Sequence, residues 1–170
     1  RFGKGLVRAG GVRFPLTDED RRTLTERIEE LKPHVQHTID LLFATSSVRS
    51  RFEDCGTVST EDAQKLGLVG PAGRACGNPY DVRRCFPSEH YPQLEIPEHA
   101  MTGGDVFARA KMRADEVMQS IEIIRSLLKQ SVETSIVEDP VAAAAPDSFV
   151  VTLNEAWRGE LSHCLITDTE

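Results

Sequence analysis

Two short runs of the chain contain residue types that could take part in redox or acid–base chemistry. The first is residues 155–163, with the sequence EAWRGELSH. Arg158 stays charged at any working pH and offers a rigid fork of donors, so it suits an anion, a diatomic ligand on a metal or developing charge. His163 could relay a proton near neutral pH, and Gly159 leaves room for another group to approach the backbone. Because exposed charged turns are common, an ordinary surface hairpin is the alternative interpretation.

The second run is residues 70–77, with the sequence GPAGRACG. Its glycines allow positive φ angles or close packing of the backbone. The spacing differs from the GxGxxG of dinucleotide-binding sites, and the GK[ST] of a phosphate-binding loop does not follow. Arg74, with Arg83 and Arg84 further along, could line a cleft or pair with acids. The alternative is a structural loop that arginines hold in place.

The cysteines and histidines do not have the spacing of a metal site. The four cysteines are Cys55, Cys76, Cys85 and Cys164. They include no CxxC pair, so we expect no zinc or iron–sulfur site held by this chain alone, and we expect the first three to be small buried hydrophobes. His34 and His37 have helical spacing but no nearby acid to complete a site, so we interpret them as surface or partly buried residues.

Hydrophobic periodicity predicts a mainly helical framework for these runs. Residues 1–16 form a lead-in rich in glycine and arginine, and residues 17–67 contain helices. Thr17 is the expected N-cap of the first helix because three acids follow it. Apolar residues then recur every three or four positions. Pro33 should kink that helix or divide it in two, and Ser59 opens a shorter one.

The middle of the chain contains the clearest helix. Residues 68–103 are rich in glycine and proline without a lasting period, and we interpret them as a long ordered loop, a kind that is often functional. Residues 104–130 contain a long central helix, at about 105–129, with an apolar stripe over seven turns. We expect it to be the spine of a helical bundle. Residues 131–147 form a solvated connector.

The end of the chain has strand composition. Within residues 148–168, two segments are rich in β-forming residues, 149–153 and 161–167, and the residues between them, 154–160, form the connection. An antiparallel hairpin is expected. The sequence therefore predicts a mainly α fold, a helical bundle around a long central helix, with a small antiparallel β-hairpin near the C-terminus.

Composition excludes several classes of function. The chain has 170 residues, enough for one hydrophobic core. Its net charge is −7 and aromatic residues make up 6%, so we expect neither a broad electrostatic footprint nor a stacking platform for nucleic acid. No apolar run approaches the roughly 20 residues that a membrane-spanning helix needs.

Several blocks together resemble a known family, and they stand in one order along the chain: residues 10–13, 67–77, 80–83, 104–109 with the following helix, and 155–163. On these blocks the chain resembles the large-subunit family of nickel–iron hydrogenases, and most closely its membrane-bound, hydrogen-evolving branch, which includes the formate hydrogenlyase large subunit. It is also similar to the hydrogenase-like core subunit of respiratory NADH dehydrogenase (complex I). The match covers most of the chain.

The resemblance implies a role for two residues. The arginine of the family's Glu-Ala-Pro-Arg-Gly run lies over the nickel–iron centre and assists hydrogen cleavage, and it matches Arg158. The imidazole that follows matches His163. Trp157 stands where the family usually has proline, so the path of the loop differs from the usual pattern. In complex I the arginine is commonly lysine and the metal is absent, so Arg158 favours the hydrogenase branch.

The resemblance also implies a setting. The metal ligands of the family are two cysteine pairs, and we expect this chain to be an internal segment that begins after the first pair and stops before the second. We therefore expect neither bound metal nor activity in the segment itself. The nickel–iron centre is expected in the full-length protein, and an iron–sulfur cluster in a small partner subunit. Membrane subunits complete the complex, with this protein peripheral on the cytoplasmic side. The isolated segment should expose apolar surface and self-associate.

Three hypotheses follow. The first is a nickel–iron hydrogenase large subunit that couples hydrogen evolution or oxidation to electron transfer. The second is a core subunit of a complex I-type NADH:quinone oxidoreductase without nickel, associated with NAD and quinone binding in its complex. The third is a scaffold or interaction module without chemistry of its own.

Overall fold

The structure, a computed structural model, describes residues 6–8, 10–88, 91–130, 136 and 144–169. The helices are α1 (Asp18–Ala44), α2 (Ser46–Phe52), α3 (Thr60–Lys65), α4 (Gly70–Ala75), α5 (Val82–Cys85) and α6 (Val106–Lys129), with a 3₁₀ turn, η1 (Tyr91–Gln93). The strands are β1 (Val7–Arg8), β2 (Gly11–Val12), β3 (Phe149–Ala156) and β4 (Gly159–Ile166). The fold is mainly α with a β-hairpin near the C-terminus, as the sequence predicts.

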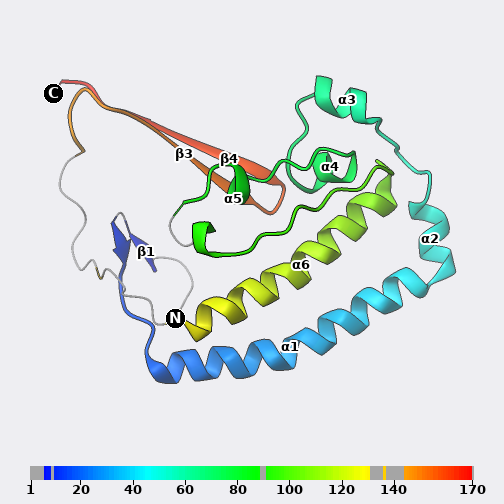
Figure 1. Cartoon of the computed structure of the whole chain (residues 1–170), viewed down its shortest axis with the longest axis horizontal. Helices are drawn as coiled ribbons and strands as arrows, with labels where there is room; N and C mark the ends of the chain where they lie inside the picture. The colour runs from blue at the N-terminus through cyan, green and yellow to red at the C-terminus, as the bar shows by residue number, and fades with distance from the viewer. Residues whose placement is uncertain (1–5, 9, 89–90, 131–135, 137–143, 170) are drawn as a thin grey trace.

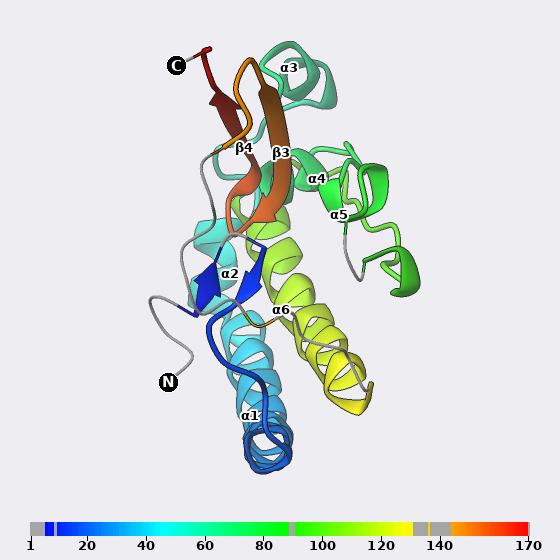
Figure 2. The same cartoon turned by 90° about the vertical axis from the view of Figure 1, so that its left-hand side faces the viewer.

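The long helices α1 and α6 lie side by side and run antiparallel (Figures 1 and 2). At one end the Arg21 side chain donates to the carbonyl oxygens of Leu128 and Gln130, at 2.7 and 2.9 Å. At the other end Phe43 packs edge to face against Phe107, with ring centroids 5.4 Å apart. The pair forms the base on which the smaller elements rest.

The starts of both long helices follow the sequence prediction. Thr17 caps α1 through its hydroxyl, which accepts from the Asp20 amide at 3.1 Å, and the Asp20 carboxylate accepts from the Thr17 amide in return. Asp105 caps α6 by accepting from the Ala108 amide at 2.7 Å. Pro33 does not divide α1, which is one continuous helix that bends near its middle (Figure 1).

The buried core lies between α6 and the short helices, and not between the two long ones. Met112 of α6, Pro71 and Cys76 are the largest fully buried side chains, whereas α1 contains no buried residue. The expectation of buried cysteines is correct for Cys76 and wrong for Cys55 and Cys85, which are exposed. None of the described helices combines the length and apolar character needed to cross a membrane.

Residues 68–103 are more regular than the sequence indicates, because they contain α4, α5 and η1. Two backbone hydrogen bonds tie the end of this segment to α4: the Met101 amide donates to the Arg74 carbonyl, and the Gly104 amide donates to the Ala75 carbonyl, both at 2.8 Å. Short helix α4 is therefore held against the start of α6.

The C-terminal hairpin is longer than expected. Its strands include five of the residues 154–160 that the sequence assigns to the connection, with Glu155 opposite Glu160 and Ala156 opposite Gly159. Only Trp157 and Arg158 remain as the turn. This end of the hairpin reaches α4 and α5, while the other end projects away from the helices (Figures 1 and 2). The docked end thus brings the two sequence runs together.

Candidate functional site

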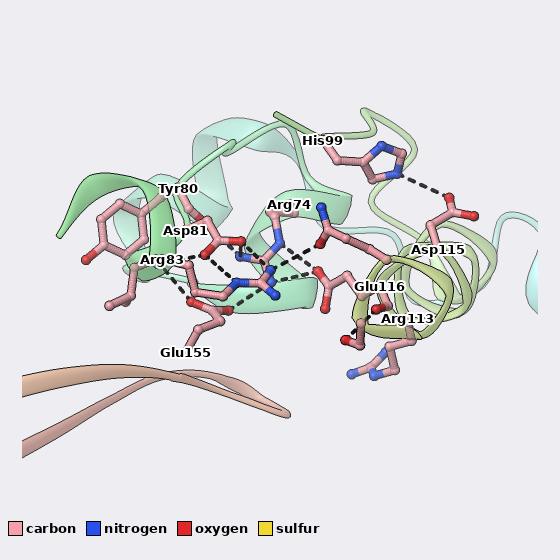
Figure 3. A network of polar contacts seen from close by, with 12 residues as sticks. Arg74, Tyr80, Asp81, Arg83, His99, Arg113, Asp115, Glu116 and Glu155 are labelled. Atoms are coloured by element: carbon pink, nitrogen blue, oxygen red, sulfur yellow. Dashed lines mark hydrogen bonds and ion pairs between the residues drawn. The ribbon is translucent and has the colours of Figure 1, made fainter. Parts of the chain in front are cut away.

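A buried arginine joins three elements at the centre of the site. Arg74 of α4 is 3% exposed. Its Nε donates to Glu116 of α6 at 2.7 Å, one terminal nitrogen donates to the Tyr80 carbonyl at 2.9 Å, and the other donates to Glu155 of β3 at 2.8 Å. Figure 3 shows the carboxylates of Glu116 and Glu155 converging on the guanidinium group. The arginine therefore fixes the hairpin relative to both helices.

Asp81 and Arg83 extend this network. Asp81 accepts two hydrogen bonds from the Arg83 side chain, at 3.0 and 2.6 Å, and lies 3.6 Å from Arg74. Burial by itself would raise the pKa of Asp81, but the hydrogen bonds and charge of Arg83 outweigh it and lower that pKa. Burial opposes the charge of Arg74, yet its bond to Glu155 and the charge of Glu116 raise its pKa. Two guanidinium groups thus face three carboxylates.

The low pKa of Asp81 predicts a loss of stability in acid. A carboxyl group with a lower pKa in the folded state stabilises the fold above its ordinary pKa of about 3.9. That contribution disappears as the pH falls through the lower folded value. Asp81→Asn is expected to cost about 1–3 kcal/mol at pH 7 and to flatten the decline below pH 4. Urea unfolding at several pH values measures both effects, and an unchanged pH dependence in the variant would refute the assignment.

A second contact docks the other strand. The Tyr80 hydroxyl donates a short hydrogen bond to the Glu160 carboxylate. This bond raises the pKa of Tyr80 to about 12, because loss of the phenol proton would place two negative charges together. Glu155 and Glu160 face each other across the hairpin, and Glu155 contacts Arg74 of α4 while Glu160 contacts Tyr80, between α4 and α5.

Two glycines provide the third contact, and they come from the two sequence runs. A side chain on Gly70 would place its Cβ 2.2 Å from the Gly159 Cα and 2.7 Å from the Arg158 carbonyl oxygen. Both glycines have positive φ, at 65° and 130°. The backbone of the turn therefore lies directly on the start of α4, an approach that only glycine permits at both positions.

The predicted site residues Arg158 and His163 lie at different positions along this hairpin. Arg158 is exposed in the turn, and its guanidinium group has no ion-pair partner among the described residues. His163 is exposed on β4 opposite Thr152. At about 3.3 Å per residue, His163 lies roughly 13 Å along the strand from Gly159. The structure does not bring the two side chains together.

The three arginines that the sequence analysis considers, Arg74, Arg83 and Arg84, all pair with acids. Arg74 pairs with Glu116 and Glu155, Arg83 with Asp81, and Arg84 with Glu98 at 2.8 Å. Sequence reasoning missed Glu116, because a charged residue of a long helix is expected on the solvated face. The available signal was spacing: Glu116 is four and eight residues after Met112 and Ala108, two of the buried residues.

An apolar groove adjoins the turn. It has a volume of about 420 Å³ and lies between α1 and α6. Leu31 and Val35 from α1, and Val117 from α6, line it beside Trp157, which is 67% exposed. The residue that replaces the proline of the resemblance therefore lines this groove, next to Arg158 in the chain.

The described residues contain no group of three or more His, Cys, Asp or Glu side chains that could hold a metal ion. His34 and His37 are exposed on α1. His99 lies 3.2 Å from Asp115 of α6 in an exposed pair.

Known proteins match this chain along nearly all of its length. The family profile described as "Respiratory-chain NADH dehydrogenase, 49 Kd subunit" matches residues 1–165. The carbon monoxide-induced hydrogenase of Rhodospirillum rubrum is 32% identical over 99% of this chain and 46% of its own length. An NADH-quinone oxidoreductase subunit of Chloroherpeton thalassium is 29% identical over 97% of this chain and 35% of its own length.

A solved structure is similar as well. In the structure of the membrane-bound sulfane sulfur reductase, an archaeal respiratory membrane complex, one chain superimposes with a TM-score of 0.84. That chain is 29% identical, and the match covers 94% of this chain and 45% of that one. The chain thus spans less than half the length of each of these three relatives.

Proposed function

Because this chain belongs to the family of the 49 kDa subunit of respiratory-chain NADH dehydrogenase, we propose that it forms part of the large subunit of a hydrogenase-like oxidoreductase. The enzyme evolves or oxidises hydrogen and passes electrons through an iron–sulfur partner subunit in a multi-subunit membrane complex. The carbon monoxide-induced hydrogenase, whose alignment covers 99% of this chain, supports the hydrogenase assignment. We place the protein peripherally on the cytoplasmic side of the membrane.

The observation that carries the proposal is the anchored turn. Arg158 stands on a two-residue turn whose base is held by Arg74, Tyr80 and the contact between Gly70 and Gly159. A permanent cation on a fixed backbone needs no reorganisation to stabilise negative charge that develops beside it. We assign this task to Arg158, and we assign proton transfer further along the hairpin to His163.

The described residues do not fit a nickel–iron centre by themselves. Cys76 is buried and the other three cysteines are exposed, and within the described ranges they belong to no metal-binding group. We therefore place the ligands of such a centre outside these residues. The role proposed for this chain is limited to charge stabilisation, positioning and proton transfer by its own side chains.

A second candidate is a core subunit of a complex I-type NADH:quinone oxidoreductase without nickel. The similarity to the NADH-quinone oxidoreductase subunit of Chloroherpeton thalassium favours it. The two candidates differ in metal content and in electron acceptor. Nickel analysis of the purified complex, together with assays of hydrogen turnover and quinone reduction, separates them. Stoichiometric nickel with hydrogen turnover supports the first, and quinone reduction without nickel supports the second.

The test of the proposed role is Arg158→Lys in the intact complex. Lysine keeps the positive charge but lacks the planar fork of donors. We expect hydrogen turnover to fall at least about tenfold, equivalent to roughly 1.4 kcal/mol of barrier, with nickel content unchanged. Arg51→Lys, at an exposed position of α2, is the control and should leave turnover unaltered. Normal turnover in Arg158→Lys would show that the assigned role is wrong.

A further inference from the structure

We propose that Glu155 is a positioning residue for Arg158, acting through Arg74. This inference rests on the proposed function, because it assumes that the location of the Arg158 guanidinium group matters for turnover. Glu155 lies three residues before Arg158 on the strand that enters the turn. Its side chain points toward Arg74 (Figure 3), with 6% of its surface exposed.

Glu155 makes bonds to two different helices. One carboxylate oxygen accepts from the Arg74 side chain at 2.8 Å, and the other accepts from the Val82 backbone amide at the start of α5, at 3.2 Å. Through Arg74 it is linked to Glu116 of α6. In the described network, this carboxylate connects the hairpin to α4 and α5 directly and to the long helix through a single intermediate.

The rest of the hairpin gives the turn little support. Phe149 and Ile166, at the far end, are 67% and 73% exposed. The orientation of the turn is therefore decided at its docked end, where Glu155 supplies the charged contact on β3 and Glu160 the one on β4. Because displacement of a reacting group by about 1 Å can cost about a hundredfold in rate, a change at Glu155 is expected to affect the chemistry without unfolding the protein.

The isosteric variant Glu155→Gln separates positioning from folding. Glutamine keeps one acceptor oxygen for Arg74, and both the glycine contact and the Tyr80 contact remain. What is lost is the negative charge and the acceptor for the Val82 amide. The turn should stay near its place but be held less firmly, so that kcat falls while KM and nickel content hold. A residue with a purely structural role would instead lower the amount of folded complex.

The experiment is a double-mutant cycle in the intact complex, with Glu155→Gln, Arg158→Lys and the double variant. We expect Glu155→Gln to lower kcat about tenfold, and the double variant to be no slower than Arg158→Lys alone, since the two residues act as one unit. Amide hydrogen exchange of the peptide spanning 153–163 supplies a readout independent of chemistry, and it should become at least about tenfold faster in Glu155→Gln. Glu61→Gln, at an exposed pair on α3, is the matched control and should change neither readout.

The outcomes separate a failure of the positioning role of Glu155 from a failure of the proposed function. If Arg158→Lys slows turnover but Glu155→Gln changes neither kcat nor exchange, the positioning role is overturned while the proposed function stands. Independent, multiplicative effects in the double variant would also overturn the positioning role. If Glu155→Gln accelerates exchange but Arg158→Lys leaves hydrogen turnover intact, the role proposed for Arg158 is overturned, and the catalytic purpose of the positioning is overturned with it. If the purified wild-type complex shows no hydrogen turnover, the proposed function itself is overturned, whatever the exchange rates.

Discussion

Replacing Arg74 with methionine is expected to lower the free energy of unfolding by about 3–5 kcal/mol. The substitution removes the cation that neutralises Glu155 and Glu116 and leaves the nearly buried carboxylate of Glu155 without its partner. It also removes the donor to the Tyr80 carbonyl. A loss of this size approaches the total stability of many domains, so the hairpin should detach or the protein should fail to fold.

Urea unfolding followed by far-ultraviolet circular dichroism measures this loss. The control is Lys65→Met, which breaks an exposed pair with Glu61 whose side chains are 66% and 76% exposed. Such surface pairs contribute about 0–1 kcal/mol. If the two variants lose equal and small amounts of stability, the Arg74 network is not the structural centre of the site. If Arg74→Met does not fold, the milder Arg74→Lys should still lower the urea midpoint more than Lys65→Met.

The second large effect is expected from Gly70→Ala. An alanine there would force a side chain into a backbone with φ of 65° and place its Cβ 2.2 Å from the Gly159 Cα. The conformational strain costs about 1–2 kcal/mol, and the overlap with backbone adds about 1–3 kcal/mol. The overlapping atoms belong to the backbone, which cannot rotate away as a flexible side chain does, so the turn should move away from α4.

Gly67→Ala is the matched control. Gly67 has nearly the same φ, 64°, but its added Cβ would meet nothing within 4 Å. The difference in unfolding free energy between the two variants therefore isolates the contact between α4 and the turn. Hydrogen exchange should locate the extra loss of Gly70→Ala in β3 and β4. Equal losses in both variants would mean that the glycine contact contributes nothing beyond local strain.

The sequence predicts the long elements well because each has a strong local signal. The central helix observed as α6 begins at Val106 after its Asp105 cap and ends at Lys129, within one residue of the predicted range. Pro33 has the first of the two predicted effects, because α1 bends without dividing. The resemblance to the hydrogenase and NADH dehydrogenase families, which the separate blocks indicate, is confirmed by the match over residues 1–165.

Short elements and distant contacts are what local patterns miss. Helices α4 and α5 have six and four residues, too few to show a helical period. The strands extend through Glu155 and Glu160, which have low strand preference, because their carboxylates bind Arg74 and Tyr80 elsewhere in the fold. Tertiary contacts thus override local preference at the docked end.

Only part of the site can be predicted from the sequence. Both runs can be recognised, and the glycines in each indicate close packing, but nothing local shows that Gly70 packs against Gly159. Two of the acids that pair with Arg74, Glu116 and Glu155, lie 42 and 81 residues away from it. Pairing at such separation depends on topology, which a single sequence does not specify, so the sequence indicates the arginine without its partners.

Trp157 gives this arrangement a practical use. It is the single tryptophan of the chain, it adjoins Arg158 in the turn, and it lines the apolar groove between α1 and α6. The indole ring has an apolar body and one polar N–H group, so its emission wavelength and intensity respond to its surroundings. The isolated chain therefore carries an intrinsic fluorophore at the point where the hairpin meets the helices, and no label is needed to observe that junction opening or closing in solution.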